Sequence, residues 1–215
     1  MAEERNRHDH GGEGEFQPDL EDSPAGEYEL TAQAMRELLV EKGVFTGEDI
    51  RARIEQLDAI EPALGGRIVA RAWTDPDFKG RLLENGTEAV KDFGVDMGEA
   101  DLAVIEDTPD SHNLIVCTLC SCYPRQVLGL PPDWYKSRNY RSRAVVEPRA
   151  VLREFGTEIA DNVAIRVLDS TADIRYMVLP LRPAGTEGWD EERLAGTVTR
   201  DTLVGVTLAR SGATG

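Results

Sequence analysis

The most informative segment of this 215-residue chain is Leu114-Ile115-Val116-Cys117-Thr118-Leu119-Cys120-Ser121-Cys122-Tyr123. Its first three residues are large and apolar, which predicts a buried strand that runs directly into Cys117. All three cysteines of the chain lie within residues 117–122, so they cannot link distant parts of a secreted scaffold. We therefore expect the cysteines to perform local chemistry on a loop that hangs from a strand end.

The residues around this loop predict a mixture of helices and strands. Strands are expected where β-branched residues lie between turn residues, at 102–105, 163–168, 174–181 and 203–208. Helices are expected at 67–73 and 78–93, with turn signals at Asp75-Pro76 and Asn85-Gly86, and at 140–155, where Pro148 marks a bend or a restart.

Two amphipathic helices are expected before these elements. One begins at Thr31 and ends at Gly43 in a left-handed cap, and the other begins at Thr46, three residues before Asp49, and closes at Pro62. The pattern predicts three parts: a disordered acidic tail at 1–28, a helical arm at 29–62 and a domain at 63–215 that carries the cysteine loop. The tail holds His8 and His10, which either catch a divalent ion or are solvated.

The amino-acid composition argues against several classes of binding partner. The chain has 40 Asp and Glu against 24 Lys and Arg, a net charge of -16, which argues against nucleic acid and membrane surfaces as partners. No apolar stretch approaches the roughly 20 residues of a membrane span, and the start lacks a signal-peptide core. We expect a cytoplasmic protein.

The cysteine spacing predicts an unusual metal site. A metal held by the sulfurs of Cys120 and Cys122 lies close to the peptide nitrogens of Ser121 and Cys122, and these four donors define a plane once the amides lose their protons. Cys117 then supplies an axial thiolate and leaves the opposite position open for substrate. Planar anionic nitrogens with thiolates favour trivalent cobalt or iron over zinc, which prefers tetrahedral sites.

Three other interpretations compete with this one. A structural zinc site needs a fourth ligand, for which His112 is the nearby histidine; an iron–sulfur cluster normally needs four thiolates; and the cysteines could also be inert. Thiolates around a trivalent ion are prone to oxidation, and the resulting oxygens need arginine partners. Arg125, Arg138, Arg141 and Arg143 follow the loop, although each can equally pair with surface carboxylates.

The cysteine loop resembles that of the nitrile hydratase alpha subunits and of the related thiocyanate hydrolase gamma subunit. The resemblance rests on Val116 to Pro124 and Leu128 to Lys136, and it continues through Glu147-Pro148-Arg149, Asp169-Ser170, Arg175 to Pro180 and Arg182 to Gly188. With it we expect an α+β fold, in which a helical N-terminal arm is followed by a layered α/β/β/α-type domain that carries the cysteine loop.

The resemblance implies a cobalt-type nitrile hydratase subunit, a hydro-lyase that converts a nitrile to an amide. It implies Co(III), with Fe(III) as the alternative, bound by Cys117, Cys120, Ser121 and Cys122, with Cys120 as sulfinate and Cys122 as sulfenate. It also implies beta-type partner subunits, in one chain or two, and a metal-loading activator protein. Cys122, Cys120 and Arg125 are the expected catalytic residues.

One residue departs from the pattern of the two-subunit nitrile hydratases and indicates a second candidate substrate. Arg125 stands where two-subunit nitrile hydratases carry tryptophan, as in the thiocyanate hydrolase subunit, and a guanidinium near the pocket would attract an anion. Hydrolysis of thiocyanate to carbonyl sulfide and ammonia is therefore the alternative. A non-catalytic zinc-binding interaction subunit is a third interpretation.

Overall fold

The computed structural model describes residues 26–50, 63–120 and 122–211, and the chain comprises two units, 1–50 and 51–215. The first unit contains helix α1 (Glu27–Glu41), which begins four residues before the expected Thr31. Gly43 ends it with a φ of 68°, and the N–H of Val44 donates to the carbonyl of Leu39, so the predicted left-handed cap is confirmed.

The cap predicted at Thr46 is also present in the first unit. The N–H of Asp49 donates to Oγ1 of Thr46, and the N–H of Thr46 donates in return to the Asp49 carboxylate. Helix begins after this box, as expected. The rest of the predicted second helix, with Pro62 at its end, lies outside the described residues, as do His8 and His10.

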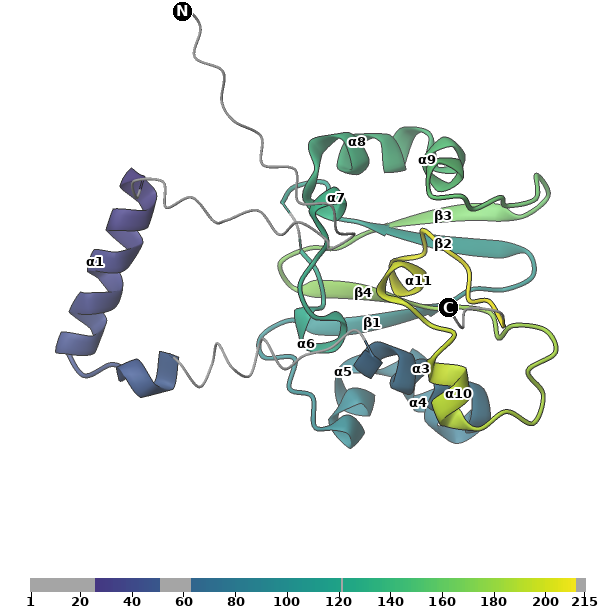
Figure 1. Cartoon of the computed structure of the whole chain (residues 1–215), viewed down its shortest axis with the longest axis horizontal. Coiled ribbons are helices and arrows are strands. Elements are labelled where there is room, and N and C mark those ends of the chain that lie inside the picture. The colour runs from purple at the N-terminus through teal and green to yellow at the C-terminus, as the bar shows by residue number, and fades with distance from the viewer. Residues whose placement is uncertain (1–25, 51–62, 121, 212–215) are drawn as a thin grey trace, which may run out of the picture. The chain divides into compact units, whose positions relative to one another are not determined.

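The second unit has four layers, helix, sheet, sheet and helix, which confirms the expected α+β class and layering (Figure 1). Its elements are α3 (Ala63–Thr74), α4 (Pro76–Glu84), α5 (Gly86–Ala89), the 3-10 turn η1 (Val90–Phe93), β1 (Asp101–Glu106), β2 (Ser111–Val116), α6 (Arg125–Leu128), α7 (Asp133–Lys136), α8 (Arg138–Val146), α9 (Pro148–Glu154), β3 (Ala164–Asp169), β4 (Ile174–Leu179), α10 (Glu191–Ala195) and α11 (Arg200–Val204).

Two parallel strand pairs form the inner layers. β1 pairs with β4, and β2 pairs with β3, so that Val116 lies opposite Asp169. Short connections, 107–110 and 170–173, reverse the chain between the pairs, which places the ends of β2 and β3 beside the starts of β1 and β4. α4 and α5 pack on β1, whereas α8 and α9 pack on β2 and β3. The cysteine loop leaves the sheet at this edge.

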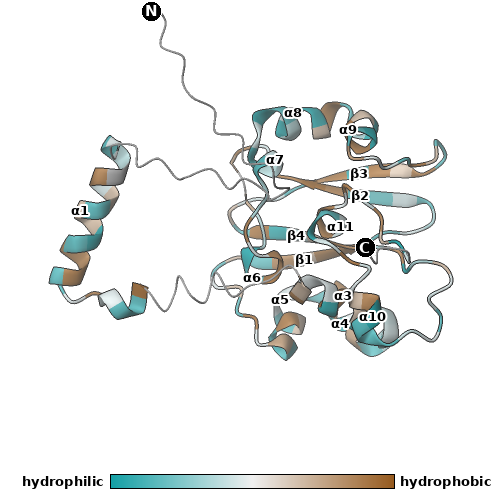
Figure 2. Ribbon diagram, viewed as in Figure 1, coloured by the Kyte–Doolittle hydropathy of each residue, from teal (hydrophilic) through white to brown (hydrophobic). Residues whose placement is uncertain are grey.

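Hydrophobic residues concentrate in the strands, between helices of mixed character (Figure 2). Leu114, Ile115 and Val116 of β2 are at most 1 % exposed, as expected for a strand covered on both faces. Asp75 and Asn85 cap α4 and α5 with their side chains, and Pro148 restarts the chain as α9, so these turn signals are confirmed. No described helix is both long and apolar enough to cross a membrane.

The strand predicted at 203–208 is wrong. The segment instead ends helix α11, which starts in a capping box between Thr199 and Thr202 and stops at Gly205, where φ is 87°. Leu203, Val204 and Val206 are buried against the core, so the apolar run reflects burial of a helix end and a turn. Short apolar runs cannot distinguish these cases by periodicity alone.

Candidate metal centre

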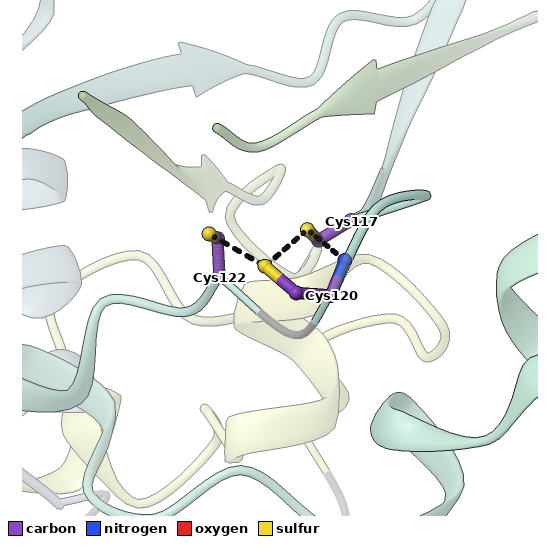
Figure 3. Close-up of side chains that lie close together, drawn as sticks. All are labelled: Cys117, Cys120 and Cys122. Atoms are coloured by element: carbon purple, nitrogen blue, oxygen red, sulfur yellow. Dashed lines mark hydrogen bonds between the residues drawn. The ribbon is translucent and has the colours of Figure 1, made fainter. Parts of the chain in front are cut away.

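The three cysteine sulfurs point toward one another in the loop that follows β2 (Figure 3). Sγ of Cys120 lies 3.5 Å from Sγ of Cys117 and 3.2 Å from Sγ of Cys122. Cys117 is buried, Cys122 is half-buried and Cys120 is exposed. Within the described part of the chain, no other group of three His, Cys, Asp or Glu side chains converges closely enough to hold a metal ion.

A tight turn brings Cys120 back over Cys117. The N–H of Cys120 donates to Sγ of Cys117 at 3.3 Å, and the sulfur thereby satisfies a backbone donor that has left the strand ladder. Ser121 lies outside the described residues, so its predicted peptide-nitrogen ligand stays a prediction. The spacing from Cys117 to Cys122 therefore converges the three sulfurs as the sequence predicted.

Asp169 fixes the first residue of this turn. Its carboxylate accepts the N–H of Thr118 at 2.9 Å and the Thr118 hydroxyl at 2.5 Å. The contact follows from the parallel pairing, which ends β2 and β3 at the same edge, and the N–H of Ser170 extends it by donating to the Val116 carbonyl. From the sequence Asp169 stands out only as part of a motif, because strand register is not readable from one sequence.

The opposite side of the loop rests on α7 and α8. The hydroxyl of Tyr140 donates to the carbonyl of Ile115 at 2.6 Å, and the hydroxyl of Tyr135 donates to the carbonyl of Cys122 at 2.9 Å. Between them, Nη1 of Arg141 approaches the carbonyl of Thr118 at 3.5 Å. Both tyrosines are held in edge-to-face contact with Trp134, which fixes where their hydroxyls lie.

The arginines named from the sequence have different environments. Arg143 pairs with Glu147 and Glu154 on the surface, as the surface interpretation predicted. Arg141 instead reaches the cysteine loop. Arg125 and Arg138 are exposed, and no side-chain ion pair of either is found among the described residues. Arg175 of β4, which sequence reasoning missed as an oxygen partner, has a buried Nη1 without an acceptor and lies near Cys122.

His112 is not at the site. It is the second residue of β2, near the strand end opposite Cys117, where Nδ1 lies 3.1 Å from the Asp107 carboxylate and Nε2 lies 2.7 Å from the Gly205 carbonyl. The cluster of three sulfurs does not include it. The zinc interpretation thereby loses its nearby fourth ligand.

The environment of the cysteine loop disfavours ionisation of the Cys122 thiol. Burial, followed by the hydrogen bond between Cys122 and Cys120 and the charge of Cys117, raises the pKa of Cys122 to about 12, and the charge of Arg175 only partly opposes this. Three thiolates at these separations need a cation between them. The donor set therefore fits a thiolate-bound metal ion.

Comparisons with known proteins give the family. A family model described as nitrile hydratase, alpha chain, matches residues 26–207. The chain is 48% identical over 189 residues to the cobalt-containing nitrile hydratase subunit alpha of Pseudonocardia thermophila, covering 85% of this chain and 92% of that one. It is 44% identical over 200 residues to the thiocyanate hydrolase subunit gamma of Thiobacillus thioparus, covering 87% and 82%.

Solved structures agree with the sequence comparisons. A thiocyanate hydrolase mutant aligns with a TM-score of 0.82 at 43% identity, covering 89% of this chain and 94% of that one. An Fe-type nitrile hydratase variant from Comamonas testosteroni aligns with a TM-score of 0.77 at 42% identity, covering 86% and 91%. The fold, the cysteine loop and these matches lead to one conclusion: this chain belongs to the nitrile hydratase alpha chain family.

Proposed function

We propose that this chain is the metal-binding catalytic subunit of a cobalt-type nitrile hydratase, which adds water to a nitrile and releases the amide. The observation that carries the proposal is the convergence of three sulfurs within one hydrogen-bonded loop. Relatives at 48% and 50% identity are named cobalt-containing nitrile hydratase subunits alpha. Cobalt is therefore favoured over iron, although an Fe-type relative has the same fold.

The ligands in this proposal are the sulfurs of Cys117, Cys120 and Cys122 with the peptide nitrogens of Ser121 and Cys122. A trivalent ion bound there would supply Lewis acidity toward the cyano nitrogen. Cys117, buried at the strand end, anchors the loop to the core. Cys120 is more exposed than Cys117, and we assign it the sulfinate state.

Cys122 is the residue that we assign to attack. As a sulfenate, its oxygen, or a water molecule that it activates, is the nucleophile toward the nitrile carbon. Tyr135 holds the Cys122 carbonyl, and it thereby fixes the backbone on which the nucleophile is carried. Arg125 lies three residues downstream and is exposed, and we assign it to contact with substrate or with a partner subunit.

Two exposed leucines lie in or shortly after the cysteine loop. Leu119 is 87% exposed and Leu130 is 59% exposed, and large apolar side chains beside a reactive centre favour a covering subunit. We propose that beta-type subunits, in one or two chains, provide this cover. A metal-loading activator protein and a cytoplasmic location complete the proposal.

The second candidate is hydrolysis of thiocyanate to carbonyl sulfide and ammonia at the same centre. Arg125 favours it, because the side chain is exposed and forms no ion pair within the described residues, which leaves its charge available to an anion. The thiocyanate hydrolase gamma subunit is also 44% identical to this chain.

One assay separates these candidates. The purified complex is given a neutral aliphatic nitrile or thiocyanate, and amide and ammonia are measured together with metal content. Amide from the nitrile supports the first proposal, and ammonia from thiocyanate without amide replaces it with the second. Zinc in place of cobalt or iron, with no added oxygen on the loop peptide, would establish the non-catalytic interpretation.

A further inference from the structure

Arg141 has an environment that neither surface pairing nor core packing explains. Its Nη1 approaches the carbonyl of Thr118 at 3.5 Å, and its Nε is buried without an acceptor. No carboxylate pairs with it among the described residues, although the chain as a whole carries an excess of acidic groups. Arg143, two residues along the same helix, is instead paired with Glu147 and Glu154.

The position of Arg141 is costly for the fold alone. A buried N–H without an acceptor destabilises a protein, and the long contact to Thr118 recovers only part of that loss. An arginine retained in this geometry is better explained by what it does to the loop than by the stability that it adds.

The residue that Arg141 contacts is the one that sets the turn. Asp169 accepts the N–H and the hydroxyl of Thr118 from the β3 side, and Arg141 meets the Thr118 carbonyl from the α8 side. All polar groups of Thr118 are thereby engaged. Only Thr118 and Leu119 separate Cys117 from Cys120, so the orientation of the Thr118 peptide determines where the two sulfurs lie.

We propose that Arg141 is a positioning residue of the metal centre, which acts through the Thr118 carbonyl to hold the sulfurs of Cys117 and Cys120 at ligating separation. The proposal rests on the proposed function in assuming that the thiolates bind a metal ion. Side chains that orient ligating groups in this way typically alter metal retention when they are changed.

The test compares Arg141→Ala and Arg141→Lys with Arg143→Ala, which removes the same charge from the same helix. Each full-length chain is produced with the subunits that copurify with it and supplied with cobalt. Cobalt loss to a chelator, the visible sulfur-to-cobalt absorption band and the mass of the peptide that contains residues 117–122 are measured. Arg141→Ala should lose cobalt about fivefold faster, as expected for one weak hydrogen bond, with partial recovery in Arg141→Lys. Arg143→Ala should match the unaltered chain.

Two results would overturn the proposal: cobalt loss from Arg141→Ala at the unaltered rate, or equal acceleration in Arg143→Ala. If Arg141→Ala shows no cooperative thermal transition, Arg141→Lys decides, because faster cobalt loss supports the proposal and an unchanged rate refutes it. An assembly that retains cobalt but acts on neither nitrile nor thiocyanate would refute the proposed function while leaving the test of Arg141 readable.

Discussion

Replacing Gly205 with alanine tests why the chain turns where a strand was expected. Gly205 has a φ of 87°, and a Cβ built on it would lie 2.0 Å from the carbonyl oxygen of Asn113 and 3.3 Å from Cα of Leu114. Both atoms belong to the backbone of β2 and cannot rotate aside. The turn must therefore separate from the strand that carries the cysteine loop.

The cost follows from the contacts that such a separation removes. A left-handed alanine costs about 1 kcal/mol, loss of the hydrogen bond from His112 to the Gly205 carbonyl costs about 1 kcal/mol more, and burial of the flanking valines is weakened. We expect Gly205→Ala to lower the free energy of unfolding by at least about 3 kcal/mol. For a chain of this length, that loss lowers Tm by roughly 6–12 °C.

Gly156→Ala is the matched control. Gly156 also has a positive φ, 74°, but nothing lies within 4 Å of the place that an alanine Cβ would take, so only the conformational penalty of about 1 kcal/mol applies. Urea unfolding, monitored by circular dichroism, gives the free energy of unfolding of both variants under the same conditions. Equal destabilisation by the two substitutions would refute the argument that backbone contact with β2 fixes this turn.

Three further predictions concern the site and its support. Cys122→Ala should abolish turnover and Cys117→Ala should abolish cobalt retention, as measured by amide formation and metal analysis; full activity in either variant would contradict the ligand assignment. Asp169→Ala removes two hydrogen bonds to the loop and should accelerate cobalt loss about tenfold. Chelator competition measures this rate, and an unchanged rate would show that the loop holds its shape without Asp169. Burial acts to lower the pKa of His112, but the hydrogen bond and charge of Asp107 and the carbonyl of Gly205 outweigh it, so the pKa is raised. The stability that His112 contributes is therefore complete below its unfolded pKa of about 6.5 and is lost as pH rises through the higher folded value. The difference in unfolding free energy between the unaltered chain and His112→Gln should shrink with increasing pH. A difference that grew with pH would contradict the raised pKa.

Local signals were sufficient for much of the fold. The cap at Thr46 and Asp49, the turn at Asn85 and the restart at Pro148 depend on contacts between residues that are close in sequence, and all three occur as predicted. The strand at Leu114 was predicted for the same reason, since its apolar run is short and ends in a turn. The strand prediction for the segment after Thr202 was wrong because a buried helix end and a buried strand have the same composition over a few residues.

The local sequence was enough to predict that the three sulfurs converge, because the spacing of Cys117, Cys120 and Cys122 limits how they can meet on one short loop. The side chains that hold this loop could not be predicted in the same way, because they come from distant parts of the chain. Asp169 reaches it through the register of β2 against β3, and Arg141 reaches it because α8 packs on β2. Register and packing arise from contacts between residues far apart in the chain, and no local pattern records them.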